Sequence, residues 1–276
     1  MPKVLRQLLR DWAAVSGALI LSVLVLASIF APWLLPYGFA EGVALPFEPP
    51  SKLFWLGTDE VGRDIFTRIV YGGRVSLAVG FISSSIALVG GIPLGLVSGY
   101  LGGFVDTVVM RLMDMMFAFP AIILALAIIA VLGPSLANAM IAIGLMQIPL
   151  FARLVRANTL SLKRQDFVQA AVAQGASSAR VIFVHILPNS MAAVIVQFTL
   201  TFASAVLVEA ALSFLGLGVA PPQPSWGAML DTGRKLITIS PLYSVAAGAA
   251  IFVTVLSLNL IGDALRDVLD PRMVER

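Results

Sequence analysis

Long apolar stretches alternate with short polar segments along most of the chain. A transmembrane helix needs about 20 mostly apolar residues to cross a hydrocarbon core of roughly 30 Å. Six stretches match this requirement, and they cover residues 12–35, 77–100, 113–132, 136–154, 191–217 and 241–261. Gly133, Pro134 and Ser135 separate the third stretch from the fourth and indicate a hairpin turn, because Pro and Gly break helices. The pattern predicts an all-α integral membrane protein with six transmembrane helices.

Composition supports this prediction. Of the 276 residues, 59% are hydrophobic and only 12% are charged, whereas soluble domains carry roughly 25% charged residues. Too few charges remain to cover a soluble core with a wetted surface. Three basic residues precede the first apolar stretch, as in a signal peptide, but a signal peptide has a shorter apolar region of about 7–15 residues. We therefore expect an uncleaved first span.

The same composition excludes several classes of function. The chain has no cysteine and one histidine, which rules out thiol chemistry and leaves little material for a metal site. It has no phosphate-binding G-x-x-x-x-G-K-[ST] motif and no H-E-x-x-H motif. Its basic residues are too scattered to form a surface that binds nucleic acid. We expect no catalytic residue, no metal and no cofactor, and an intramembrane enzyme lacks a credible set of residues.

The distribution of charge predicts the orientation. The loop at 153–189 holds five basic residues against one acid, while the loop at 36–74 holds four basic residues and five acids. If the N-terminus lies in the cytoplasm, six crossings place the 153–189 loop and the C-terminus in the cytoplasm as well. We expect residues 1–72 to form an N-terminal transmembrane helix with an external loop, and residues 73–276 to form the main transmembrane domain.

One span carries a stripe of small residues. It consists of Ser83, Ala87, Gly91, Gly95, Gly99 and Gly103, which recur every four residues, although the last lies at the edge of the span. Residues at this spacing share a helix face, and small residues there let another backbone approach closely. The plain alternative is that glycine is common in membrane helices. We interpret Gly91, Gly95 and Gly99 as helix-packing positions.

Few ionisable residues lie within the spans. A charge at a helix centre costs at least ~2.5 kcal/mol on insertion scales, so it usually faces the bundle interior or water. Arg111 and Asp114 are three residues apart near the start of the third span. They either form a local ion pair, which is the plain interpretation, or make polar contacts across helices or along a pathway. Glu209 lies in the fifth span, where it either hydrogen-bonds across helices or lines a pathway. These acids, without an intramembrane lysine, argue against a proton-coupled transporter.

The predicted inner loop contains a distinctive motif. Residues 165–175 read QDFVQAAVAQG, and residues 185–189 read HILPN. This arrangement resembles the E-A-A loop of binding-protein-dependent ABC importers, in which a glycine follows an alanine pair and a leucine–proline follows thirteen residues later. Here that spacing runs from Gly175 to Pro188.

The resemblance implies that this loop couples the chain to an ATPase. Alanine favours a short helix and glycine its end, which agrees with a helix around the alanine pair. Gln169 stands where the family has glutamate. The coupling residues that the resemblance implies are Asp166, Gln169, Ala170, Ala171, Gly175 and Pro188.

Further stretches are similar to the C-type permeases of the dipeptide, oligopeptide and nickel importers. They are LGTDEVGRD at 56–64, the run at 212–227, Arg111 and Asp114 with AFP at 118–120, and the tail at 262–272. The resemblance extends from the first external loop to the C-terminus.

This resemblance implies a type I (MetI-like) importer permease fold in a bacterial plasma membrane. The implied partners are a second, paralogous permease, two ABC ATPase subunits that bind the ATP, an external solute-binding protein, and the membrane lipid around the chain. Peptides are the expected cargo, with nickel or another small solute as the alternative. A secondary transporter or channel is a rival interpretation, and it predicts transport without ATPase partners.

Overall fold

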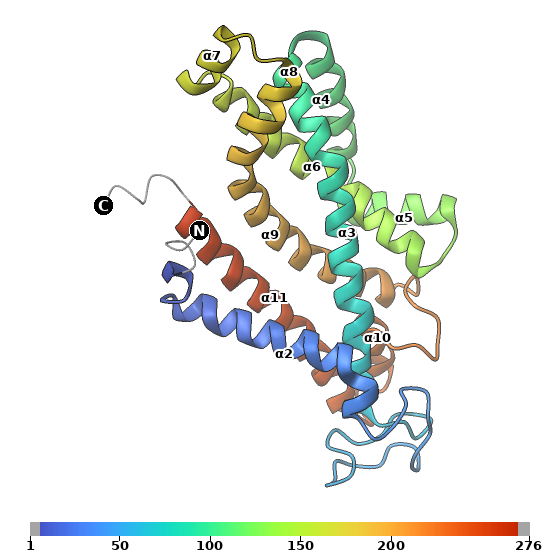
Figure 1. The fold of residues 1–276 in the computed structure, drawn as a ribbon. Helices are drawn as coiled ribbons and strands as arrows, with labels where there is room; N and C mark the ends of the chain where they lie inside the picture. The colour runs from blue at the N-terminus through green and yellow to red at the C-terminus, as the bar shows by residue number, and fades with distance from the viewer. Residues whose placement is uncertain (1–5, 270–276) are drawn as a thin grey trace.

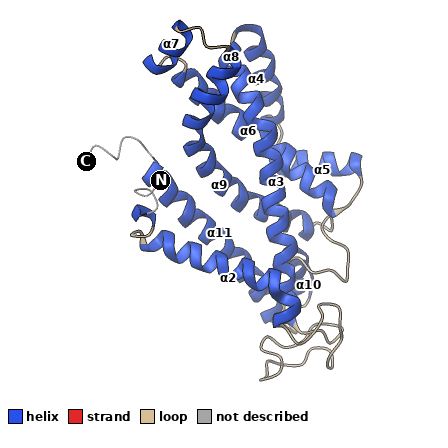
Figure 2. Cartoon of the chain, viewed as in Figure 1, coloured by secondary structure: helices blue, strands red, loops and turns tan. Residues whose placement is uncertain are grey.

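The computed structural model describes residues 6–269, and within this range the chain is helical apart from its loops and one isolated bridge between Thr58 and Asp64 (Figures 1 and 2). The elements are α2 (Trp12–Leu34), α3 (Ile65–Leu101), α4 (Gly103–Phe117), α5 (Ala121–Leu132), α6 (Leu136–Leu162), α7 (Asp166–Ala173), α8 (Ser178–Arg180), the π-helix η1 (Val181–Ile186), α9 (Leu187–Phe214), α10 (Trp226–Lys235) and α11 (Pro241–Leu269).

The predicted all-α membrane fold is confirmed. Five helical segments in the described range are long and apolar enough to cross a membrane: α2, α3, α6, the continuous segment Ser178–Phe214, and α11. The remaining candidate is the pair α4 and α5, which is bent by 95° at a short break. Pro120 follows Phe119 at this break, and a proline disfavours the helical conformation of the residue before it. The third span is therefore broken, whereas the sequence predicted one continuous helix.

The direction of neighbouring helices shows how often the chain crosses. Gly91 of α3 lies against Phe151 of α6, and Gly99, further along α3, lies against Thr159, further along α6. The two helices therefore run in the same direction. Between them, α4 and α5 must return the chain to the side on which α3 began. The bent pair counts as one crossing, which gives six.

Helix α6 extends further than predicted. It ends at Leu162, so Arg153 and Arg156 belong to this helix and not to a loop. The next long span begins at Ser178, and Pro188 lies in the first turn of α9, within that span. The connection between the two spans is therefore 163–177, which is much shorter than the predicted loop at 153–189.

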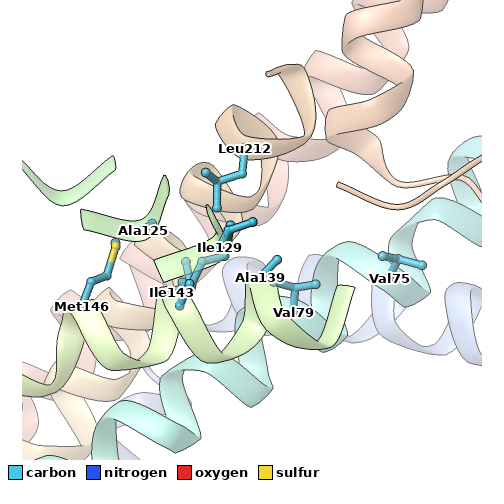
Figure 3. Packing of buried hydrophobic residues seen from close by; sticks show 10 residues of the cluster. Val75, Val79, Ala125, Ile129, Ala139, Ile143, Met146 and Leu212 are labelled. Carbon is cyan, nitrogen blue, oxygen red and sulfur yellow. The ribbon is translucent and has the colours of Figure 1, made fainter. Parts of the chain in front are cut away.

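Two of the buried apolar clusters follow one another along α3. The first joins α3, α5, α6 and α9, and its members include Val75, Val79, Ala125, Ile129, Ala139, Ile143, Met146 and Leu212 (Figure 3). The second lies towards α7 and joins Leu96 of α3, Phe151 and Val155 of α6, and Val181 and Ile186 of η1. Helix α5 thus packs in the first cluster, away from the end of the bundle that carries α7.

The segment between α2 and α3 has defined structure although it is not helical. The carboxylate of Asp59 is fully buried and accepts hydrogen bonds from the backbone N–H groups of Val61 and Arg63, and from Nε of Arg63 at 2.6 Å. Asp64 caps α3 by accepting a hydrogen bond from the N–H of Thr67 at 2.8 Å. These contacts fix the shape of the loop where the chain enters α3.

Candidate functional site

Helix α7 lies at one end of the bundle, between the end of α6 and the start of α8 (Figure 1). One side chain fastens it: Val168 is only 1% exposed and packs in the second cluster with Val155 and Val181. Asp166 lies in the first turn, where a negative charge interacts favourably with the helix dipole.

Most other side chains of α7 are exposed and face away from the bundle. Phe167 is 43% exposed and Val172 is 48% exposed, and Gln169 and Ala170 are exposed beside them. Ala171 is half-buried. A helix with one buried anchor and an exposed face of small and apolar side chains offers a surface on which another protein can seat closely.

Helix α7 ends in a Schellman motif. Gly175 has φ +82°, its N–H donates to the carbonyl of Val172 at 2.9 Å, and the N–H of Ala176 donates to the carbonyl of Ala171 at 3.0 Å. The predicted end of the helix at Gly175 has this physical cause. A Cβ at Gly175 would meet nothing of this chain within 4 Å, so the position is open on its outer side.

Gln169, which stands where the E-A-A motif has glutamate, makes a hydrogen bond that a glutamate could not make. Nε2 of Gln169 donates a hydrogen bond to the carbonyl of Lys163 at 2.7 Å. Nζ of Lys163 in turn donates to the carbonyl of Tyr100 at 2.7 Å and lies 5.1 Å from the centre of the Tyr100 ring. An ionised glutamate has no donor for the first of these bonds. Gln169 therefore links α7 to the ends of α6 and α3.

The small-residue stripe faces α6 of the same chain. A Cβ on Gly95 would lie 2.5 Å from the carbonyl oxygen of Ala152, and a Cβ on Gly99 would lie 2.8 Å from Cβ of Thr159. Real Cβ atoms essentially never approach other atoms so closely. Gly91 is in equally close contact with α6, whereas Gly103 has open space around it and lies outside the stripe.

The ion pairs differ from the predicted one. Asp114 does not pair with Arg111; its Oδ1 accepts from Nη2 of Arg153 on α6 at 2.6 Å. Arg111 is exposed on the surface of α4. The local pair is wrong because spacing within one helix identifies only local partners, and Arg153 becomes a neighbour only when α6 packs beside α4; for Asp114 the geometry favours the interhelical alternative.

A second carboxylate on α4 joins three helices. Asp106 accepts two hydrogen bonds from Arg156 on α6, at 2.5 Å from Nε and 2.6 Å from Nη2. It also accepts one from the buried hydroxyl of Ser98 on α3. The sequence does not predict this cluster, because the fourth apolar stretch ends before Arg156 and leaves it in the predicted loop. The available signal is an acid between two apolar stretches and an arginine just beyond the next one.

Glu209 lies inside the bundle. The residue is only 3% exposed. Its carboxylate accepts hydrogen bonds from the hydroxyl groups of Ser76 on α3, at 3.1 Å, and of Ser213 on its own helix α9, at 2.7 Å. The hydroxyl of Ser76 also accepts the backbone N–H of Trp226, the first residue of α10. This geometry favours the interhelical alternative for Glu209, because the carboxylate joins α3, α9 and α10.

These features define a class of protein: a polytopic membrane protein with a short, exposed helix between two spans at one end of its bundle. Comparison with known families agrees. Residues 91–275 match the model of the binding-protein-dependent transport system inner membrane component, and residues 3–50 match the N-terminal transmembrane domain of oligopeptide transport permease C. The chain belongs to the binding-protein-dependent transport permeases.

Individual relatives align over nearly the whole chain. The dipeptide transport system permease protein of Alkalihalophilus pseudofirmus is 49% identical, over 97% of this chain and 88% of the relative. The di/tripeptide transport system permease protein of Pseudomonas aeruginosa is 45% identical over 94% and 88%. The glutathione transport system permease protein of Pectobacterium atrosepticum is 43% identical over 97% and 90%.

Proposed function

We propose that this chain forms half of the path by which an ATP-driven importer carries short peptides into a bacterial cell. A second, paralogous permease forms the other half, two ABC ATPase subunits bind and hydrolyse the ATP, and an external binding protein delivers the solute. The chain itself binds no cofactor and hydrolyses nothing. Helix α7 is the ATPase docking element, and the end of the bundle that carries it faces the cytoplasm, as do both termini.

The observation that carries this proposal is the construction of α7. Its single buried anchor, its exposed small and apolar face and its open glycine terminus leave a surface that this chain does not use. Lys163 and Arg164 follow α6 directly, and basic residues next to a span favour the cytoplasmic side. The peptide cargo is supported by the relatives, since two of those named above transport di- or tripeptides and glutathione is itself a short peptide.

Substitution of Gly175 tests the docking role. We expect Gly175→Trp to block docking, because its ring would project from the open side of the helix end into the ATPase. Gly175→Asn is the matched control, since asparagine tolerates positive φ and adds little bulk. The complex is purified in lipid nanodiscs, and ATP hydrolysis is measured with and without the loaded binding protein. We expect stimulated hydrolysis to be lost in the Trp variant and retained in the Asn variant.

Two outcomes would contradict the proposal. If Gly175→Trp leaves stimulated hydrolysis at the wild-type rate, α7 does not dock the ATPase. If both variants lose it equally, the backbone conformation of Gly175 matters but the outer surface of α7 does not.

A further inference from the structure

The ion pair between Asp114 of α4 and Arg153 of α6 is open on one side. The side chain of Arg153 is 47% exposed and that of Asp114 is 55% exposed. Within the described residues the contact joins Oδ1 of Asp114 to Nη2 of Arg153, which leaves the second oxygen and the other N–H groups for further hydrogen bonds. Arg111, one turn earlier on α4, is exposed as well. The same stretch of surface therefore carries three charges.

The position of Arg153 along α6 places this pair at the depth of the lipid tails. Helix α6 has 27 residues and, at about 1.5 Å per residue, is about 40 Å long, which exceeds the roughly 30 Å hydrocarbon core by about 10 Å. Arg153 lies nine residues before Leu162, the last residue of α6, and therefore about 13 Å from that end. Even if the whole excess projected at this end, Arg153 would remain inside the hydrocarbon core.

Lipid is a poor neighbour for charges at this depth. Ionisable side chains within a span almost always face the interior of a bundle or a water-filled cavity, because lipid tails offer them neither water nor hydrogen-bond partners. The bundle of this chain does not cover the pair, since both side chains are about half exposed. The open side of the pair therefore faces either water or another subunit.

The break between α4 and α5 points to the same surface independently. Helix α4 ends at Phe117, and residues 118–120, which lead into α5, are all exposed. Within residues 6–269 no side chain caps the start of α5. Non-helical backbone at membrane depth is tolerated only where protein covers it or where it lines a water-filled cavity. This chain does not cover it, so the break requires the same neighbour as the ion pair does.

Water suits this surface better than a partner subunit does. Arg111, Asp114 and Arg153 together carry one net positive charge, and a dry interface would have to bury that charge along with every unmatched hydrogen-bonding group. The guanidinium of Arg153 lies 4.2 Å from the centre of the Phe117 ring, which holds it in place and leaves its outer N–H groups free. Exposed groups of both signs next to an apolar ring match a short peptide, which has an ammonium end, a carboxylate end and variable side chains.

We propose that Asp114 and Arg153 line the water-filled peptide path beside the break between α4 and α5 and determine which charged peptides pass. Asp114 attracts the ammonium groups of the peptide, and Arg153 attracts its carboxylates. This inference rests on the proposed function, because it names the groups that the permease offers to its substrate.

A single cysteine tests whether water reaches this surface, because the chain has no native cysteine. Ala118 is exposed and lies one turn after Asp114, so Ala118→Cys leaves the ion pair intact. The complex is assembled in lipid nanodiscs with partner subunits that carry no accessible cysteine, and it is treated with a small, charged thiol reagent. We expect Ala118→Cys to react, whereas Val89→Cys, at an exposed apolar position of α3, should react only with an uncharged reagent. No reaction at position 118 would overturn the proposal, because lipid or the partner permease would then cover this surface.

Selectivity between charged peptides tests the contact itself. Uptake into liposomes is measured for alanyl-lysine, which adds an ammonium group, and for alanyl-glutamate, which adds a carboxylate. Each peptide is delivered by saturating binding protein, so the affinity of that protein does not enter the ratio of the two uptake rates. We expect Asp114→Asn to lower the ratio of lysyl to glutamyl peptide several-fold, and Arg153→Gln to raise it several-fold.

Asp106→Asn is the matched control, since it removes the same charge from the other ion pair between α4 and α6, whose carboxylate is only 18% exposed. We expect it to leave the ratio at the wild-type value. A merely structural role of Asp114 and Arg153 predicts equal losses for both peptides, so an unchanged ratio in their two variants would overturn the proposal. An equal shift in Asp106→Asn would overturn it as well, because the ratio would then report the net charge of the chain.

The labelling experiment needs neither charge variant, so it stays decisive if those variants fail to assemble. Failure of the proposed function would be recognised separately, because the wild type would then show no ATP-driven uptake of either peptide.

Discussion

Single buried polar groups connect the helices of this permease where apolar packing alone would leave their orientation open. Glu209 is the clearest case: within the described residues it accepts hydroxyl hydrogen bonds from α3 and α9, and Ser76 relays the connection to the first N–H of α10. The start of α10 packs closely at this point, since a Cβ on Gly227 would lie 2.6 Å from Cα of Ala210. Trp226 is 1% exposed, and its Nε1 donates to the carbonyl of Ile69 at 2.8 Å. Glu209 therefore positions α10 against α3 and α9.

Substitution of Glu209 separates the two roles that its sequence position left open. Glu209→Ala leaves two hydroxyl groups without their acceptor and should destabilise the protein by about 1.5–3 kcal/mol. Glu209→Gln keeps an acceptor oxygen and the side-chain volume, so it should be tolerated. Thermal unfolding of the purified complex measures both. Peptide uptake by the reconstituted complex then separates the two roles: an interhelical role predicts that the stable Glu209→Gln variant keeps transport, whereas a pathway role predicts that it loses transport.

At the scale of elements, the pair α3 and α6 forms the centre of the molecule. The glycine face of α3 lets the backbone of α6 approach within the same chain, so the stripe serves the folding of this subunit and not its association with a partner permease. Gly95 is a sharp test, because its missing Cβ would collide with backbone atoms of Ala152 and Arg156, which cannot turn aside as a flexible side chain can.

Gly95→Leu should therefore damage the subunit before it pairs with a partner. Overpacking of a tight contact typically costs about 1–3 kcal/mol, and backbone contacts place this site at the upper end. Gly248→Leu in α11 is the matched control, since a Cβ there would come no closer than 4.0 Å to Leu230. Size-exclusion chromatography of the separately expressed chain should show loss of the monodisperse peak for Gly95→Leu alone. Equal behaviour of the two variants would mean that the stripe is not a packing face.

Helix α7 provides a second prediction at this scale. Gln169→Glu places the family's usual residue here but removes the donor that reaches the carbonyl of Lys163. The bond is exposed, so its loss should cost only about 0.5–1.5 kcal/mol and loosen α7 locally. Hydrogen–deuterium exchange should rise in 165–175 while other helices keep their protection. Unchanged exchange would show that this hydrogen bond does not hold α7 in place.

The elements also show what the sequence can predict and what it cannot. Apolar stretches of sufficient length predict spans because lipid enforces that length, and Gly175 predicts a helix end because of its backbone freedom. The break before Pro120 was not predicted, since an apolar stretch of the right length looks continuous whether or not the helix bends. The partners Arg153 and Arg156 were missed because they come from another helix, and only packing brings them to Asp114 and Asp106.

At the scale of the whole molecule, α7 and the loop between α2 and α3 lie at opposite ends of the bundle (Figure 1). Helices α3 and α6 run in the same direction, and both lead towards α7.

This topology predicts a pattern of labelling. Single cysteines at Ser51 and Gln223, both exposed, should react with a membrane-impermeant thiol reagent in intact cells. A cysteine at Ser177, also exposed, should react only after lysis. The cysteine-free chain is the control for background. Labelling of position 177 in intact cells would show that the orientation is the opposite one, with α7 outside the cell, where no ATPase can reach it.

The central claim is that this chain imports peptides only as part of an ATP-driven complex. The most direct measurement is uptake of a radiolabelled dipeptide by liposomes that contain this permease with its paralogous permease and the ATPase pair, in the presence of the binding protein. The account predicts uptake that requires ATP on the side of α7 and stops when the ATPases or the binding protein are left out. Uptake by the permeases alone, driven by an ion or peptide gradient, would contradict it and identify a secondary transporter or channel.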